Sequence, residues 1–312
     1  MWTLYPPCPV SSTLKSDRQT TGVLLALGAF GWWGAITPVY YHALKTVNVF
    51  ELIAWRIVAG LPLLLILLWM TRRLPHLRQV LTRPRTMMML VASALLIGVN
   101  WFVFIWAVDT DRLAEVSLGY YINPLVSVAL GMLVLGERMR PAQWIAVAVA
   151  IAGVAVSAVG IDGVPWISLS LAGSFAFYGL VRKQVDADAA TGLTVEMLLF
   201  LPLMLVILAM VHGGEGTSFA HGPWWLSIML LLGGPVTIVP LLLFTGGARR
   251  LRLATIGLLQ YIAPTGQLLL AVLVYGEEFD AERLAAFILI WIAVLTYSTD
   301  SFLASRSPSR DG

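Results

Sequence analysis

The feature that most constrains this chain is a series of ten apolar runs, each about long enough to cross the hydrocarbon of a bilayer. A transmembrane helix needs about 20 mostly apolar residues. Because hydrocarbon holds no water to bind backbone polar groups, such a run must fold as a helix. We therefore predict an all-α, polytopic membrane protein with ten transmembrane helices. The expected spans are residues 22–41, 52–70, 87–108, 114–135, 142–160, 164–181, 193–211, 225–247, 253–275 and 284–303.

The composition agrees with a membrane protein and excludes an ordinary soluble enzyme. Of the 312 residues, 59% are hydrophobic and 12% are charged, whereas soluble domains carry about 25% charged residues. After ten spans, only short loops, an N-terminal tail (1–21) and a C-terminal tail (304–312) remain, which leaves no room for another folded domain. The single cysteine, Cys8, cannot form an internal disulfide.

The basic residues indicate how the chain is oriented. With the N-terminus inside, the inner side holds sixteen Lys and Arg residues and the outer side three, while Arg56 falls inside the second run. Cytoplasmic loops carry such an excess, so both termini are predicted to be cytoplasmic. The basic residues lie between apolar runs rather than on one face, so the net charge of +3 indicates topology and no nucleic-acid partner.

An internal repeat divides the chain. Residues 112–137 and 252–277 align without a gap at an offset of 140, with 12 identities in 26 positions. Composition alone would produce agreement at roughly a tenth of positions. The repeat units are residues 22–160 and 164–303.

Each unit contains five expected spans. Because five is odd, the second unit must enter the membrane in the opposite sense to the first. Inverted repeats are the usual architecture of secondary transporters, in which two halves open a central site alternately to each side. The pattern therefore favours a secondary transporter or permease for a small organic metabolite or drug-like solute.

Polar residues at matching positions of the two units are the main candidates for binding that solute. The fourth run carries Tyr120, Tyr121 and Asn123, and the ninth carries Gln260 and Tyr261. We expect these side chains to flank a cavity near the membrane midplane. The competing interpretation is that the tyrosines are interfacial anchors.

A proline follows each cluster. Pro124 and Pro264 cannot donate a backbone hydrogen bond, so they should free the carbonyls of Tyr120 and Gln260. Each site would then gain an acceptor beside a polar side chain. The prolines are equally consistent with simple helix kinks.

Three further residues are weaker candidates. Asn100 is an amide deep in the third run, where it would bind either a solute or a neighbouring helix. Trp32 lies at the centre of the first run and offers either a flat cavity wall or ordinary packing. Arg56 could pair with an anionic solute, extend outward, or pair with Glu51.

Other chemistries lack a signal. The sequence has no phosphate-binding G-x-x-x-x-G-K-[ST] motif, no clustered metal ligands and no nucleophile beside an evident base. We therefore predict no enzyme activity, no metal and no cofactor. The expected partners are a small-molecule solute and membrane lipid, and nothing indicates an oligomeric state. A membrane-embedded enzyme and a non-transporting sensor or scaffold remain the alternatives.

Several motifs resemble a known family. They are N-W-x-x-F-I-W-A-V at 100–108, L-G-Y-Y-I-N-P-L-V at 118–126, L-G-E-R at 135–138, S-F-A-F-Y-G-L-V-R-K at 174–183, R-L-R-L-A-T-I-G at 250–257 and Q-Y-I-A-P-T at 260–265. Together they resemble the RarD group of the EamA family, within the drug/metabolite transporter superfamily. The resemblance covers nearly the whole chain after about residue 22.

That resemblance implies a ten-helix inner-membrane transporter with two EamA units and a central cavity. Small multidrug exporters of the same superfamily couple transport to protons through a glutamate in their first helix. Residues 22–41 contain no acidic residue, so proton coupling by that route is not expected here.

Overall fold

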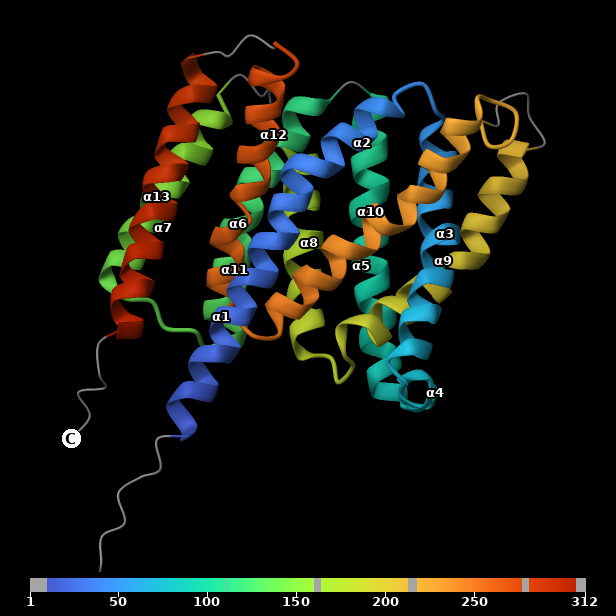
Figure 1. Ribbon diagram of the computed structural model, residues 1–312. Helices are drawn as coiled ribbons and strands as arrows, with labels where there is room; N and C mark the ends of the chain where they lie inside the picture. Colours follow the sequence, from blue (N-terminus) through green and yellow to red (C-terminus); the bar gives the residue numbers. More distant parts are fainter. Residues whose placement is uncertain (1–9, 111, 160–163, 213–217, 277–280, 307–312) are drawn as a thin grey trace, which may run out of the picture.

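The structure, a computed structural model, is a bundle of helices (Figure 1). It describes residues 10–110, 112–159, 164–212, 218–276 and 281–306, which contain no β-strand. The helices are α1 (Val10–Gly31), η1 (Trp32–Ile36), α2 (Thr37–Ala43), α3 (Val49–Met70), α4 (Leu74–Thr82), α5 (Pro84–Asp109), α6 (Leu113–Leu135), α7 (Pro141–Ser157), α8 (Trp166–Gln184), α9 (Ala189–His212), α10 (Trp224–Ala248), α11 (Leu253–Leu259), α12 (Ile262–Leu273) and α13 (Ala281–Arg306).

Most of these helices have the length and apolarity of membrane spans. Within the described residues, seven helical segments meet both criteria, and two shorter apolar helices, at residues 141–157 and 284–300, accompany them. The helix α8 is less apolar because Ser168, Ser170 and Ser174 interrupt it. It nevertheless packs inside the bundle against α5 and α6. The protein is thus an all-helical, multi-pass membrane protein.

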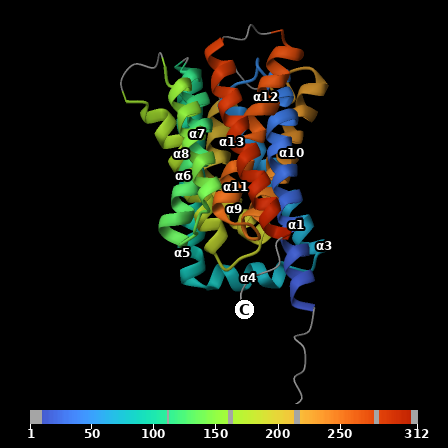
Figure 2. The ribbon, with the colours of Figure 1, turned by 90° about the vertical axis from the view of Figure 1, so that its left-hand side faces the viewer.

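The helices pack in a regular set of pairs. The helix α3 lies between α9 and α10, α8 contacts α5 and α6, and α1 runs along α10. The helices α7 and α13 pair at one side of the bundle, as Figure 2 shows. The largest cluster of buried apolar residues joins α1, α3, α9 and α10, and includes Ile57, Met197 and Phe244. Residues from both halves of the chain therefore share one core.

The chain ends differ from the expected tails. The helix α1 begins at Val10 and α13 continues to Arg306, so parts of the predicted tails are helical. The first residue of α1 and the last of α13 lie at the same end of the bundle, where α4 also lies (Figure 1). The short helix α4, within a loop rich in arginine, was not expected from the apolar runs.

Two expected spans are interrupted. The first contains the π-helical turn η1, and the ninth is divided into α11 and α12 at Gln260 and Tyr261. The interruptions meet, because a Cβ atom added to Gly34 of η1 would lie 3.0 Å from the carbonyl oxygen of Ala263 and 3.2 Å from the Cα of Gly266. Glycine at this crossing lets the two backbones touch.

We predict that Gly34→Ala destabilises the protein by about 1–3 kcal/mol, because the added methyl group must push the backbone of α12 away. Gly31→Ala is the matched control, since a Cβ atom there would meet nothing within 4 Å. Thermal unfolding of both variants in the same detergent measures the difference. Equal midpoints for the two variants would contradict the close helix crossing.

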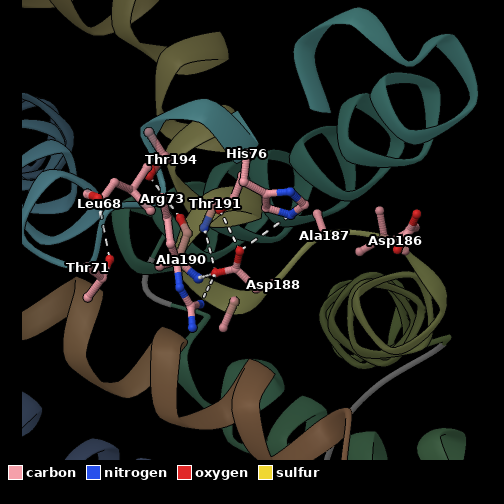
Figure 3. A network of polar contacts seen from close by, with 12 residues as sticks. Leu68, Thr71, Arg73, His76, Asp186, Ala187, Asp188, Ala190, Thr191 and Thr194 are labelled. Atoms are coloured by element: carbon pink, nitrogen blue, oxygen red, sulfur yellow. Dashed lines mark hydrogen bonds and ion pairs between the residues drawn. The ribbon is translucent and has the colours of Figure 1, made fainter. Parts of the chain in front are cut away.

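At the end of the bundle that carries α4, Asp188 joins two segments of the chain. Its carboxylate accepts hydrogen bonds from the backbone N–H groups of Ala190 (3.1 Å) and Thr191 (3.2 Å), which caps the start of α9. It also accepts the Thr191 hydroxyl at 2.6 Å and lies 2.9 Å from Arg73 and 3.6 Å from His76 (Figure 3). The α3–α4 segment is thereby tied to α9.

These contacts lower the pKa of Asp188. Burial alone would raise it, but the hydrogen bonds from Thr191 and the pairing with Arg73 outweigh burial. The folded pKa is thus below the ordinary value of 3.8. The charged carboxylate therefore contributes stability that is complete above the ordinary pKa and is lost as the pH falls through the folded pKa.

We expect Asp188→Ala to lose about 1 kcal/mol of stability at neutral pH, because the cap of α9 disappears. Asp188→Asn keeps a capping oxygen but not the charge, so its unfolding midpoint should fall less than that of the wild type as the pH drops below about 4. Asp186→Asn is the control, because its ion pair with Arg83 is exposed on both sides. If the unfolding midpoints of wild type and Asp188→Asn fall equally as the pH drops, the role of the charge is refuted.

Candidate functional site

A cavity of about 170 Å³ lies among helices from both halves of the chain. Its lining residues come from α1, η1, α2, α3, α5 and α6 of the first half, and from α8, α10 and the α11–α12 segment of the second half. Seven of its lining residues are aromatic: Phe30, Trp33, Tyr41, Trp101, Phe104, Tyr120 and Phe175. Six carry uncharged polar side chains: Thr37, Asn100, Asn123, Thr237, Gln260 and Gln267.

The aromatic wall is built on a helical stripe. Phe30, Trp33, Thr37 and Tyr41 follow one another at intervals of three or four residues, so they share one face of the first span. The ring of Trp33 lies 5.8 Å from that of Phe30 and 5.8 Å from that of Phe175, with an edge-on contact to the latter. Tilted and edge-on ring pairs are favourable, so these contacts stabilise the wall.

The polar lining contains both satisfied and unsatisfied groups. Asn100 donates to the carbonyl of Leu171 and to the hydroxyl of Ser174, both at 3.0 Å, so it joins α5 to α8. By contrast, Asn123 Oδ1 and Gln260 Oε1 are buried and have no hydrogen-bond partner in the described structure. A buried acceptor without a partner costs free energy, and a solute that donates hydrogen bonds would remove that cost.

Arg56 lies in the cavity wall and is held from three directions. Its Nε donates to the hydroxyl of Thr237 at 2.6 Å. The guanidinium carbon lies 5.0 Å from the ring centroid of Trp101 and 5.8 Å from that of Tyr41. Cations over aromatic faces are attracted by the ring quadrupole, so these contacts fix the guanidinium group at the cavity.

Glu51 does not pair with Arg56. Its carboxylate is buried and accepts hydrogen bonds from the backbone N–H groups of Ser218 (2.9 Å) and Phe219 (3.0 Å). The loop before α10 occupies the acceptors that Arg56 would need. Of the alternatives for Arg56, the ion pair with Glu51 is therefore wrong.

Five of the eight sequence-predicted site residues line the cavity, and three do not. Tyr120, Asn123, Gln260, Asn100 and Arg56 belong to its wall. Tyr261 is instead buried in a core cluster of apolar residues, and Tyr121 packs against the same cluster. The hydroxyl of Tyr261 donates a hydrogen bond to the backbone carbonyl of Tyr121 at 3.0 Å. Trp32 is also absent from the lining, and its neighbour Trp33 takes that place.

The two prolines act differently from one another. Pro124 lies inside the continuous helix α6. Pro264 lies in the first turn of α12, after the break between α11 and α12. The carbonyl of Gln260 accepts the backbone N–H of Ala263 at 3.0 Å. The expectation that Pro264 frees this carbonyl is therefore wrong, because the broken helix supplies another donor.

Gln267, Thr37 and Thr237 line the cavity but were not among the predicted site residues. The sequence carries a spacing signal for the first two. Gln267 follows Gln260 by seven residues, about two helical turns, inside an otherwise apolar run, and it donates to the carbonyl of Trp33 at 3.2 Å. Thr37 belongs to the aromatic stripe of the first span. Thr237 carries no such periodic signal, since its role depends on its contact with Arg56.

A buried ion pair lies outside the cavity lining, between α8 and α9. Arg182 and Glu196 are almost fully buried, with a separation of 3.5 Å between Nη1 and Oε1. Ser93 donates to Glu196 at 2.5 Å and Tyr178 at 3.3 Å, so the carboxylate joins α5, α8 and α9. Removing one member of such a pair is costly, because the other charge is then left buried without a counter-charge.

We predict that Arg182→Met destabilises the protein by about 3–5 kcal/mol, because Glu196 is left buried without its counter-charge. The double variant Arg182→Met with Glu196→Gln should be more stable than Arg182→Met alone. Arg140→Met is the control, since its exposed pair with Asp300 contributes less than about 1 kcal/mol. Chemical unfolding in detergent measures these variants together with the single variant Glu196→Gln, and simple additivity of the two substitutions would contradict the coupling.

Comparisons with known proteins agree with this architecture. The EamA-like transporter family matches residues 20–159. An uncharacterized transporter of Vibrio cholerae is 43% identical over 95% of this chain and 99% of its own. Protein RarD of Escherichia coli K12 is 42% identical over 95% of this chain and 99% of its own. The uncharacterized transporter YojE of Bacillus subtilis is 39% identical over 91% and 96%.

A solved crystal structure shares the fold. It superposes with a TM-score of 0.69 at 20% sequence identity, over 93% of this chain and 100% of the other. The relatives carry transporter names rather than enzyme names. Identity of this extent over almost the full length shows that the chain belongs to the EamA-like transporter family, as a RarD-type member.

Proposed function

We propose that the protein is a secondary transporter that moves a small organic metabolite or drug-like solute across the inner membrane by alternating access. The observation that carries this proposal is the cavity between helices of the two halves. Both halves contribute polar groups to it, Asn100 and Asn123 from the first and Gln260 and Gln267 from the second. A solute site at the interface of two repeats is the arrangement that rocking transporters use.

The helix contacts support ten spans in two inverted five-helix units. In a pseudo-twofold arrangement, a helix of one unit can pack against the equivalent helix of the other unit. Every other helix–helix contact should have a counterpart between the two equivalent helices. The pairs α3–α9, α6–α11 and α7–α13 join equivalent elements of the expected units. The contact of α5 with α8 has its counterpart in the contact of α10 with α1. The units 22–160 and 164–303 are consistent with this pattern.

The charges support an orientation with both termini in the cytoplasm. The start of α1, the end of α13 and the arginine-rich segment around α4 lie at one end of the bundle (Figure 1). An even number of spans places both termini on one side, and basic loops favour the cytoplasmic side. Large apolar side chains such as Leu95, Met88 and Leu133 are exposed on the surface, where we expect them to contact lipid.

Alternating access can be tested without knowing the solute, because Cys8 is the sole cysteine. In a Cys8→Ser background, we expect Thr37→Cys, in the cavity wall, to react with a membrane-impermeant maleimide both in right-side-out and in inverted membrane vesicles. The reason is that the site opens to each side in turn. Mass-shift labelling on gels measures the reaction.

Two controls test the topology of the chain in the same right-side-out and inverted vesicles. Thr110→Cys, between α5 and α6, should react only from outside, and Asp186→Cys, between α8 and α9, only from inside. Reaction of Thr37→Cys from a single face under all conditions would refute alternating access. Reaction of Thr110→Cys only from inside and of Asp186→Cys only from outside would refute the orientation, and reaction of both from the same face would refute an odd number of spans between them.

A further inference from the structure

The cavity carries a net positive charge. Arg56 is the one ionisable acid or base, apart from tyrosine, among the residues that line it. Within the described part of the chain, the ion pairs involve other arginines or His76, and none of them includes Arg56. Arg182 shows the contrast, since its charge is balanced by Glu196. The cavity therefore favours an anion.

The orientation of the Arg56 guanidinium group leaves its two terminal Nη atoms available for that anion. The Nε–H is engaged by Thr237, and the rings of Trp101 and Tyr41 lie beside the group. No hydrogen bond joins the terminal Nη atoms to another described residue. The two terminal nitrogens of arginine match the two oxygens of a carboxylate in a bidentate pair. The free edge of Arg56 is suited to a carboxylate.

The rest of the lining describes the remainder of the solute. The aromatic wall, including Trp33, Phe104 and Phe175, suits a flat apolar body. The unpartnered acceptors Asn123 Oδ1 and Gln260 Oε1 require a hydrogen-bond donor on the solute. The volume of about 170 Å³ is below the range of about 300–1,000 Å³ for drug-sized ligands, so the solute is small.

We propose that the cavity binds a small organic anion with a planar apolar body and a hydrogen-bond donor, whose carboxylate pairs with Arg56. This substrate class rests on the proposed transport function. Arg56 selects the charge, the aromatic wall selects the flat body, and the two amides bind the donor. A cation of the same shape is rejected because it meets a like charge in a medium of low dielectric constant.

The test uses three probes that share a shape and differ in charge: 4-hydroxybenzoate, 4-hydroxybenzamide and 4-hydroxybenzylamine. Each is titrated against the purified full-length protein in lipid nanodiscs, and binding is measured by calorimetry and thermal shift. We expect the anion to bind about tenfold or more tightly than the neutral amide, the gain typical of a charge-assisted pair, and the cation to bind most weakly. Equal affinities, or no binding of the anion at millimolar concentration, would overturn the proposal.

Variants assign the preference to Arg56. Arg56→Gln should lower the affinity for 4-hydroxybenzoate to that for the amide, while Arg56→Lys should keep part of the preference. Arg83→Gln is the matched control, because Arg83 lies outside the cavity in an exposed ion pair with Asp186. An unchanged preference for the anion in Arg56→Gln would overturn the assignment. The comparison of probes on the wild type stands even if this variant does not fold.

The binding experiment is separable from the transport proposal. If the anion binds through Arg56 but Thr37→Cys reacts from one face only, the anion-binding site holds and alternating access fails. If Thr37→Cys reacts from both faces but charge does not affect binding, alternating access holds and the substrate class fails.

Discussion

The structure depends on one constraint: inside hydrocarbon, each backbone N–H and C=O group must find its partner within the protein. Helices satisfy this requirement locally, so the apolar runs become helices before any tertiary contact decides their arrangement. Side chains then divide by polarity. Large apolar groups such as Leu95 and Leu133 are exposed at the outer surface, while polar groups concentrate between helices, where partners are available.

The polar groups of the interior fall into two kinds with different consequences. Glu51, Asn100 and the pair of Arg182 with Glu196 have partners and connect helices to one another. Asn123 and Gln260 each present an acceptor without a partner at the cavity, and Arg56 presents a charge without a counter-charge. The first kind explains cohesion of the bundle. Under the proposed function, the second kind serves the solute, because these groups at the cavity gain favourable contacts when a solute binds.

The interruptions of the helices lie beside that site. The π-helical turn η1 and the break between α11 and α12 meet where Gly34 touches the backbone near Gly266. Interruptions of this kind are frequent at functional sites, and a glycine contact lets two helices approach closely. These features place the least regular backbone of both halves against the cavity. That is the location at which a rocking motion between repeats would require compliance.

Much of this organisation follows from the order of residue types along the chain. Hydrocarbon tolerates so few backbone conformations that apolar runs predict helices. The 12 identical positions between residues 112–137 and 252–277 predict two related halves. Tyr120, Asn123, Gln260, Asn100 and Arg56 could be chosen as cavity residues because polar groups within apolar runs need a partner inside the protein.

The rotation of each helix about its own axis could not be predicted from the order of residue types. Neighbouring residues of a helix point about 100° apart, so of Trp32 and Trp33, or of Tyr120 and Tyr121, one member lines the cavity and the other does not. The turn η1 and the break before α12 change that rotation locally. The loop that binds Glu51 also comes from the other half of the chain. These outcomes depend on which surfaces meet in three dimensions, so they were settled only by tertiary packing.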